Sequence, residues 1–345
     1  MLKKMFERPV ALKSRASKIF RAVSFVPLFV FGSFSSLQAE TTLSTLTALP
    51  TKHALAQSYI KHFIEPLNTQ GKGIVKINLL GGPEVTPAQR APQAMQRGVV
   101  DILWIPAAYV AGIVPEAQAM MLQTVGIEQL RSGSGFSTFE KVFSERLQSK
   151  LLAWAETGPG SGYYLYTKPE PKMKDGVVDL TGLTMRTTGA YRPIQEALNA
   201  TTVAIPSGDV PTGLERGVVH GFGWPTVGLG SIGLAELIKY RVEPKFYNLA
   251  NVVLISNEKW SSLPAEARKI IEKVAKEYEL ASVQEMITQN KADIDVANKA
   301  GVKALVMSGE NEKKYLKIAE DAMWDVVAKK IDPAEARRLR GIISK

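Results

Sequence analysis

Short strands alternate with helices over residues 180–230, and this alternation most constrains the fold. The segment reads as a strand that carries Arg186, a helix, a second strand at residues 202–205, a capped helix, and a third strand entering residues 221–225. This order is typical of an α/β layer with a parallel sheet, which binds ligands in the crevice beyond its strand ends. We therefore expect Arg186 and Trp224 to face one crevice.

A similar unit precedes this segment. A strand ending at residues 48–50, a helix over residues 53–68 and a strand at residues 74–80 predict one βαβ unit. The sequence AMQRGVVDILW at residues 94–104 also resembles GLERGVVHGFGW at residues 213–224. The repeat indicates either common helix–glycine–strand chemistry or two lobes built alike, each with a tryptophan near a strand end.

The remaining segments predict how two lobes are joined. Between the units we expect a strand over residues 101–115, helical turns over residues 138–152, and a strand pair interrupted by a glycine-rich turn over residues 153–168. The cluster of Gly, Ser and Pro at residues 158–164 favours a first crossing between lobes, and the apolar strand at residues 252–256 favours a second.

A long helix follows the second crossing. Apolar residues at helical spacing predict one helix from after Leu263-Pro264 to about Lys299. More than 30 such residues extend about 50 Å, long enough to brace both lobes. A strand over residues 301–307 and a last amphipathic helix over residues 311–331 complete the expected fold.

The N-terminus has the order of a secretory signal peptide, which we place at residues 1–39. A basic opening precedes an apolar run and then LQA before Glu40. A retained membrane anchor is the alternative, but the apolar run is shorter than the roughly 20 residues that span a bilayer. The expected domains are then lobe I at residues 40–162 plus 252–291 and lobe II at residues 163–251 plus 292–345.

Charge and cysteine content limit the possible partners and chemistry. Residues 1–39 hold seven Lys or Arg and one Glu, which leaves 36 basic and 32 acidic residues in the rest of the chain. No basic run there could neutralise several phosphates, so we expect no nucleic-acid partner. The chain has no cysteine, which excludes disulfides, thiol catalysis and cysteine-ligated zinc.

Catalytic and metal motifs are missing from the sequence. Its three histidines, His53, His62 and His220, are too far apart for a recognisable metal motif. No paired carboxylates or Ser-His-Asp order stands out, and GPGSG at residues 158–162 matches a phosphate loop only weakly. We therefore expect no enzyme, no cofactor and no metal, although His220 or Glu84 is the only plausible general base if the chain were a lyase or hydrolase.

Arg186 is the sharpest functional signal. It lies on an apolar strand, and a guanidinium that is buried there needs an anionic partner. That partner is either an internal carboxylate or a ligand carboxylate, which the planar guanidinium suits. The aromatic residues have two interpretations each, as cleft wall or core packing: Trp224, Trp104, Tyr109, Tyr163 and Tyr164.

These motifs together resemble the substrate-binding proteins of tripartite ATP-independent periplasmic (TRAP) transporters, DctP type. The resemblance rests on GGPEV, AMQRGVVDI, DLTGLTMR, EALNATTVAIPSGDVPTGLERGVV and the long helix, and spans Thr41 to about Lys330. It implies an α/β, two-lobe periplasmic binding protein fold with a long helix spanning both lobes. It also implies capture of a small organic acid anion in the periplasm and delivery to the small and large TRAP membrane subunits.

Several positions match ligand-contacting positions of that family. Arg186 matches the strand arginine that grips the substrate carboxylate, and Ser207 falls on a ligand-facing loop. Trp224 stands where many members have a polar ligand contact just before proline. Glu84 and His53 lie on first-lobe loops that reach the cleft.

The chain departs from the family pattern in ways that bear on the ligand. Tyr163 and Tyr164 stand where members that bind a second polar group often have an arginine, and His220 replaces an aspartate. These changes favour a monocarboxylate with an apolar or aromatic body over a sugar acid or dicarboxylate. We expect Trp224 with Tyr163 or Tyr164 to pack on that body.

The opposite cleft wall, the oligomeric state and the rival functions also follow from the sequence as expectations. Trp104 and Tyr109 are expected to close the opposite wall of the cleft, and His220 is a weaker candidate for ligand contact. We expect a monomer rather than a dimer. The rival functions are a periplasmic lyase or hydrolase on the same fold and a protein that presents its ligand to a sensor.

Overall fold

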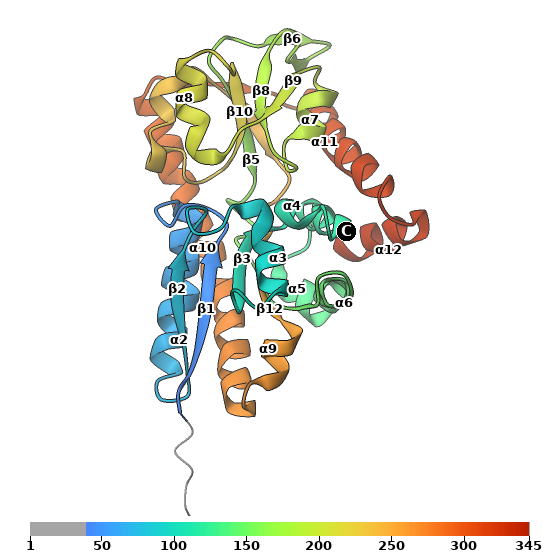
Figure 1. Cartoon of the computed structure of the whole chain (residues 1–345). Coiled ribbons are helices and arrows are strands. Elements are labelled where there is room, and N and C mark those ends of the chain that lie inside the picture. Colours follow the sequence, from blue (N-terminus) through green and yellow to red (C-terminus); the bar gives the residue numbers. More distant parts are fainter. Residues whose placement is uncertain (1–38, 345) are drawn as a thin grey trace, which may run out of the picture. The chain divides into compact units, whose positions relative to one another are not determined.

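Two mixed β-sheets organise residues 39–344, the part of the chain that the computed structural model describes (Figure 1). The expected signal peptide falls on residues outside this part, apart from residue 39, and it therefore stays a prediction. None of the helices within the described residues has the length and apolar character needed to cross a membrane.

The first sheet has five strands, and one of its interior strands comes from late in the sequence, after most of the second sheet. Their spatial order is β2 (Val75–Gly81), β1 (Thr41–Thr47), β3 (Ile102–Pro106), β12 (Asn251–Ser256) and β4 (Ser149–Ala155). β1 runs parallel to β2 and β3, whereas β12 runs antiparallel to both β3 and β4. The helical elements that accompany this sheet are α1 (Ala54–Tyr59), η1 (Ile60–Ile64), α2 (Glu65–Gln70), η2 (Ala88–Arg90), α3 (Ala91–Gln96), α4 (Ala107–Val110), η3 (Pro115–Leu122), α5 (Ile127–Ser132), α6 (Gly135–Leu147) and α9 (Asn257–Ser262).

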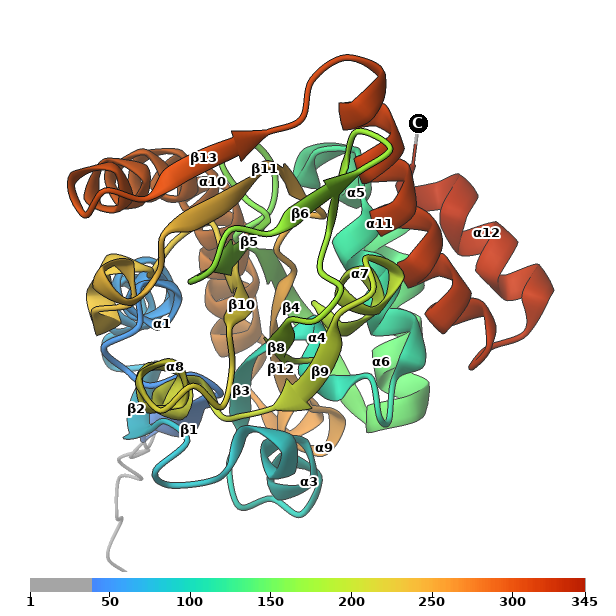
Figure 2. The ribbon, with the colours of Figure 1, turned by 90° about the horizontal axis from the view of Figure 1, so that it is seen from above.

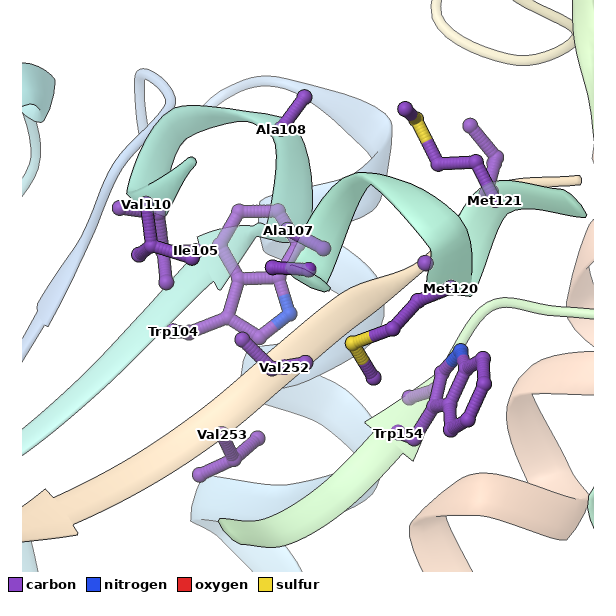
Figure 3. Close-up of a cluster of buried hydrophobic side chains, with 14 of the residues drawn as sticks. Trp104, Ile105, Ala107, Ala108, Val110, Met120, Met121, Trp154, Val252 and Val253 are labelled. Atoms are coloured by element: carbon purple, nitrogen blue, oxygen red, sulfur yellow. The ribbon is translucent and has the colours of Figure 1, made fainter. Parts of the chain in front are cut away.

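Two inner strands of this sheet, β3 and β12, are buried along almost their whole length because both of their faces are covered. In β3 and β12, Trp104 and Val252 are fully buried, and Trp154 of β4 packs edge-on against Phe139 of α6. Figure 3 shows Met120 of η3 between Trp104 and Trp154. Continuous burial of this kind is typical of sheets with helices on both faces.

The second sheet has six strands, which Figure 2 shows from above. Their order is β13 (Lys303–Val306), β11 (Tyr240–Phe246), β5 (Tyr163–Thr167), β10 (Gly221–Pro225), β8 (Thr184–Thr187) and β9 (Thr201–Ala204). β8 is parallel to β9 and β10, and β5 is antiparallel to β10 and β11. The helical elements that accompany this sheet are α7 (Arg192–Ala197), η4 (Ser207–Asp209), α8 (Val210–Glu215), η5 (Gly230–Ile232) and η6 (Ala235–Leu237). β6 (Lys172–Lys174) and β7 (Val177–Asp179) form a separate two-stranded antiparallel sheet.

One helix, α10 (Ala265–Lys299), packs against elements of both sheets and confirms the predicted long helix. Its Glu279 pairs with Arg131 of α5 and accepts a hydrogen bond from the backbone N–H of Trp154. Further along, its Asp293 accepts hydrogen bonds from the backbone N–H groups of Gly228 and Gly230, at 2.5 and 2.9 Å. The helix is therefore fastened to the first sheet by one carboxylate and to a loop of the second by another.

The C-terminus returns to the helices of the first sheet. α11 (Glu310–Ala328) packs against α7 and η3, and α12 (Pro333–Ile343) packs against η3 and α6. Leu339 and Ile343 of α12 are fully buried. The sequence predicts that residues 292–345 belong to lobe II, and these lobe boundaries stay a prediction.

Three local expectations were wrong. The strand expected over residues 101–115 ends at Pro106, opposite Asn251, the first residue of its antiparallel partner β12, and the chain turns into α4. The helix expected up to residue 152 ends at Leu147, where Gln148 adopts a left-handed conformation with φ of 50°, and β4 follows. β4 and β5 are not a strand pair, because each joins a different sheet.

Candidate functional site

Arg186 lies in β8, an interior strand of the second sheet, with only 2% of its surface exposed. Its Nε donates a hydrogen bond to the carbonyl of Ile205 at 2.9 Å. Within residues 39–344 no carboxylate forms an ion pair with its guanidinium. An internal salt bridge, one of the two partners expected from the sequence, therefore does not explain this buried charge.

Two aromatic rings flank the guanidinium. Its central carbon lies 5.6 Å from the ring centre of Trp224 and 5.9 Å from that of Tyr191, within the range of cation–π attraction. Tyr191 can approach β10 because residue 223 is glycine: a Cβ there would lie 2.3 Å from Cγ of Tyr191. The rings hold the guanidinium in place without neutralising its charge.

One small cavity brings together six of the ten residues expected at the site. They are Arg186, Trp224, Tyr163, Ser207, His53 and Tyr109. The cavity leaves about 30 Å³ free, so its own side chains nearly fill it. The walls of the cavity come from both sheets. His53 and Tyr109 follow strands of the first sheet, and the other four residues lie in strands of the second sheet or in the loop after one of them.

The other residues that line the cavity were not predicted from the sequence. They are Leu49, Leu55, Pro106, Ala108, Thr188, Ala190, Tyr191, Pro225, Leu249 and Asn251. The signal that could have found Tyr191 is its place in the loop directly after the strand that carries Arg186, at the end where parallel sheets bind ligands. Nothing in the sequence marks Asn251, which reaches the cavity only because β12 lies beside β3.

His53 lies at the first-lobe wall of the cavity and caps α1. Its Nδ1 accepts a hydrogen bond from the backbone N–H of Leu55 at 3.2 Å, and its ring centre is 5.8 Å from that of Trp224. Gly228 approaches the same ring so closely that a Cβ there would lie 2.9 Å from Cε1. Burial lowers the pKa of His53 to about 4, so the ring is neutral at neutral pH and leaves the positive charge to Arg186.

Tyr164 and Trp104 are placed away from the cavity. Tyr164 belongs to a separate buried cluster and packs on the guanidinium of Arg241, 5.5 Å from its ring centre. Side chains alternate along a strand, so only Tyr163 of this pair reaches the cavity. Trp104 is fully buried in the first-lobe core and donates from Nε1 to the Tyr278 hydroxyl at 3.0 Å.

Glu84 and His220 also lie outside the lining residues. Glu84 is exposed and accepts a hydrogen bond from the backbone N–H of Gly82 at 2.6 Å. His220 precedes β10, whereas Trp224 lies near the other end of that strand. Its Nδ1 accepts from the backbone N–H of Thr184 at 2.9 Å, which explains a histidine there without a ligand.

A fully buried carboxylate, Glu156, lies in the polar network of the first lobe. It accepts hydrogen bonds from the hydroxyls of Ser58, at 3.0 Å, and Tyr278. Burial raises its pKa to about 7, while these hydroxyls and the amide of Asn251 act against that rise. Asn251 also lines the cavity, and its buried amide nitrogen forms no hydrogen bond with the described residues. Across the described residues, no group of three or more acidic or histidine side chains is arranged to hold a metal ion.

Comparison with known proteins identifies the family. The model of the DctP family, described as bacterial extracellular solute-binding protein, family 7, matches residues 47–330. The chain belongs to this family. DctP-family membership confirms the resemblance found in the motifs around Arg186.

Individual relatives of this DctP-family chain are distant but similar over most of its length. A solute-binding protein of Albidiferax ferrireducens is 23% identical over 278 residues, which cover 77% of this chain and 79% of the relative. An extracytoplasmic solute receptor of Bordetella pertussis that binds pyroglutamic acid matches with a TM-score of 0.75 at 15% identity, covering 88% of this chain and 99% of the receptor.

Two TRAP periplasmic solute binding proteins share the same architecture. The protein from Desulfovibrio salexigens, solved with orotic acid, has a TM-score of 0.75 at 19% identity, and the match covers 88% of this chain and 97% of that protein. The protein from Rhodoferax ferrireducens, solved with malonate, has a TM-score of 0.74 at 19% identity, and the match covers 87% of this chain and 96% of that protein. The expected two-lobe α/β fold is thereby confirmed.

Proposed function

We propose that this chain is a periplasmic binding protein that captures a small monocarboxylate with an apolar or aromatic body. The cavity between the two sheets holds the ligand, and Arg186 binds its carboxylate. The loaded protein then delivers the ligand to the small and large membrane subunits of a TRAP transporter. The chain works as a monomer and performs no catalysis.

The observation that carries this proposal is the unpaired charge of Arg186. A guanidinium that is 2% exposed and has no carboxylate partner within the described chain is costly to bury. A planar carboxylate offers two oxygens that match its parallel N–H groups. A bound carboxylate therefore supplies the charge that the protein itself does not.

The other walls of the cavity favour an apolar ligand body. Besides Arg186, its polar members are the neutral His53, Ser207, Thr188, Asn251 and three tyrosines whose rings are largely apolar, and the rest are aliphatic or aromatic. A sugar acid would place several hydroxyls against walls that offer few partners, and each unpaired hydroxyl costs binding free energy. The indole Nε1 of Trp224 has no partner in the described chain and is available to a ligand oxygen.

The relatives support binding and transport over catalysis. The similar structures hold pyroglutamic acid, orotic acid and malonate, all of them organic acids. A lyase or hydrolase would need a general base at the ligand. The two candidates for that role, His220 and Glu84, do not line the cavity.

Thermal-shift screening of residues 40–345 tests the proposal. The panel contains benzoate, phenylpyruvate, pantoate and pyroglutamate alongside malonate and galacturonate. A ligand that binds only the folded protein raises the melting temperature by mass action, so we expect a rise with at least one monocarboxylate. Arg186→Lys keeps the charge but loses the paired N–H groups and should remove most of the rise.

Arg216→Lys is the matched control, because Arg216 is exposed and lines neither the cavity nor the neighbouring cleft. It should respond as the unaltered protein does. A rise that survives in Arg186→Lys and Arg186→Ala would contradict the proposed role of Arg186. A rise seen only with malonate or galacturonate would contradict the apolar ligand.

A further inference from the structure

An open cleft of about 550 Å³ adjoins the cavity. The two share lining residues: Ala108, Tyr109, Arg186, Thr188 and Ser207. Arg186 therefore forms part of the nearly filled inner cavity and also part of the larger open cleft. Any molecule that reaches Arg186 from this side passes through the cleft.

The charges on the cleft wall are all positive. Its lining residues include two arginines, Arg186 and Arg192, and no aspartate or glutamate. Arg192, the first residue of α7, is exposed, and its guanidinium has no ion pair or hydrogen bond with the part of the chain that the structure describes. Glu84, on the loop next to Pro83 of the wall, does not line the cleft and its carboxylate accepts from Gly82.

Arg192 lines the cleft but not the inner cavity. An exposed charge outside the inner cavity does little for the final complex, because water and salt screen it. The same charge inside a concave wall raises the local concentration of anions and speeds their association. Its effect is therefore expected before binding rather than in the bound state.

We propose that the cleft is the approach route of the ligand anion, and that Arg192 attracts the anion before Arg186 binds it. The inference rests on the proposed function for the identity of the anion as a carboxylate. The attraction itself acts on any small anion, so it can be measured without knowing the ligand.

The absence of cysteine makes a direct measurement possible. Gln89 is exposed and lines the cleft from the side of the first sheet, so Gln89→Cys places the chain's single thiol in the wall. Two methanethiosulfonates serve as probes, one carrying a sulfonate and the other a trimethylammonium group. In each case the thiolate attacks the sulfenyl sulfur, a disulfide forms, and methanesulfinate leaves.

The measured quantity is the ratio of the two modification rate constants, anionic over cationic. Both probes react with the same thiolate, so any change in the thiolate fraction cancels in the ratio. We expect Arg192→Gln in the Gln89→Cys background to lower this ratio about threefold or more at low ionic strength. The effect should shrink as salt is added, because the Debye length falls to about 10 Å at 0.1 M.

Arg216→Gln in the same background is the control, because it removes the same charge from an exposed site outside the cleft. It should leave the ratio unchanged. An unchanged ratio in Arg192→Gln, or an equal fall in both variants, would overturn the role of Arg192. These outcomes do not depend on Arg186 binding a carboxylate, which the thermal-shift variants of Arg186 test separately.

Discussion

At the residue scale, the burial of Arg186 has a consequence for the ligand-free protein. The carbonyl of Ile205 and the rings of Trp224 and Tyr191 interact with the guanidinium, but none of them carries the opposite charge. Removing a charge from water is only partly offset by such neutral partners. The unpaired guanidinium therefore costs the ligand-free protein some stability.

Replacing the charge should reveal that cost. We expect Arg186→Met, which keeps much of the side-chain volume, to raise the free energy of unfolding without ligand by about 1 kcal/mol. The same variant should lose the thermal response to monocarboxylates. Urea unfolding of the ligand-free proteins measures the first effect, and a variant less stable than the original would contradict it.

His53 should make stability depend on pH in a defined window. Its pKa is about 4 in the folded protein and about 6.5 when unfolded, so only the unfolded chain binds a proton between these values. The contribution of His53 to stability is therefore fully present above about pH 6.5 and is lost as the pH drops toward 4, by up to about 3 kcal/mol. The buried Glu156, whose pKa is raised to about 7, acts in the opposite direction over this window.

His53→Asn tests this sign, because asparagine still caps a helix but does not titrate. Urea unfolding at pH 7 and pH 4.5 should show that the variant becomes more stable relative to the original protein as the pH falls, because Glu156 contributes equally to both. An equal change in both would mean that His53 does not titrate as its burial implies.

At the element scale, the contact between α10 and the first crossing depends on one glycine. Gly160 has a φ of 79°, and a Cβ there would lie 2.7 Å from Cα of Ile287 and 2.9 Å from the carbonyl oxygen of Met286. These are backbone atoms of a helix, which cannot yield as a flexible side chain can. The crossing can therefore lie against α10 only with glycine at this position.

Gly160→Ala should destabilise the protein through this contact. The matched control is Gly301→Ala, since Gly301 has nearly the same φ, 78°, but no heavy atom within 4 Å of a Cβ built there. Both variants carry the strain of a left-handed residue, about 1 kcal/mol, and only Gly160→Ala adds the clash. We expect its melting temperature to fall by several degrees more than that of the control, and equal falls would contradict the argument.

Local pattern predicted the elements well and their partners poorly. The spacing of apolar residues predicted α10 because its length and period leave few alternatives. It did not predict that β4 and β5 join different sheets, since both are short apolar strands around the same glycine-rich turn. The last helix, α12, was not predicted, although Asp332 and Pro333 carry the start signal of a helix.

The candidate site shows the same limit. Arg186 was identified because a charge within an apolar strand is informative by itself. Tyr163 and Tyr164 could not be told apart, because their alternation on β5 needs a known face. Trp104 was assigned to a wall because its repeat partner is Trp224, yet strand β3 is covered on both faces and buries it in the core.

At the scale of the whole molecule, α10 ties the two sheets to each other. Glu279 holds it to the first sheet and Asp293 to the loop after β10, and the C-terminal α12 packs back on helices of the first sheet. We expect residues 40–345 to unfold in one calorimetric transition, with the calorimetric and van't Hoff enthalpies equal. Two separated transitions, or a ligand that shifts only one of them, would show that the lobes are independent.

The position of β12 also has a consequence for the order of folding. This strand pairs with β3 and β4 and lies between them, yet it follows every strand of the second sheet except β13 in the sequence. A growing chain that has not reached residue 256 therefore lacks the strand that joins β4 to the rest of its first sheet. The candidate site, which Asn251 of this strand helps to line, cannot be complete in a newly made chain until this strand is in place.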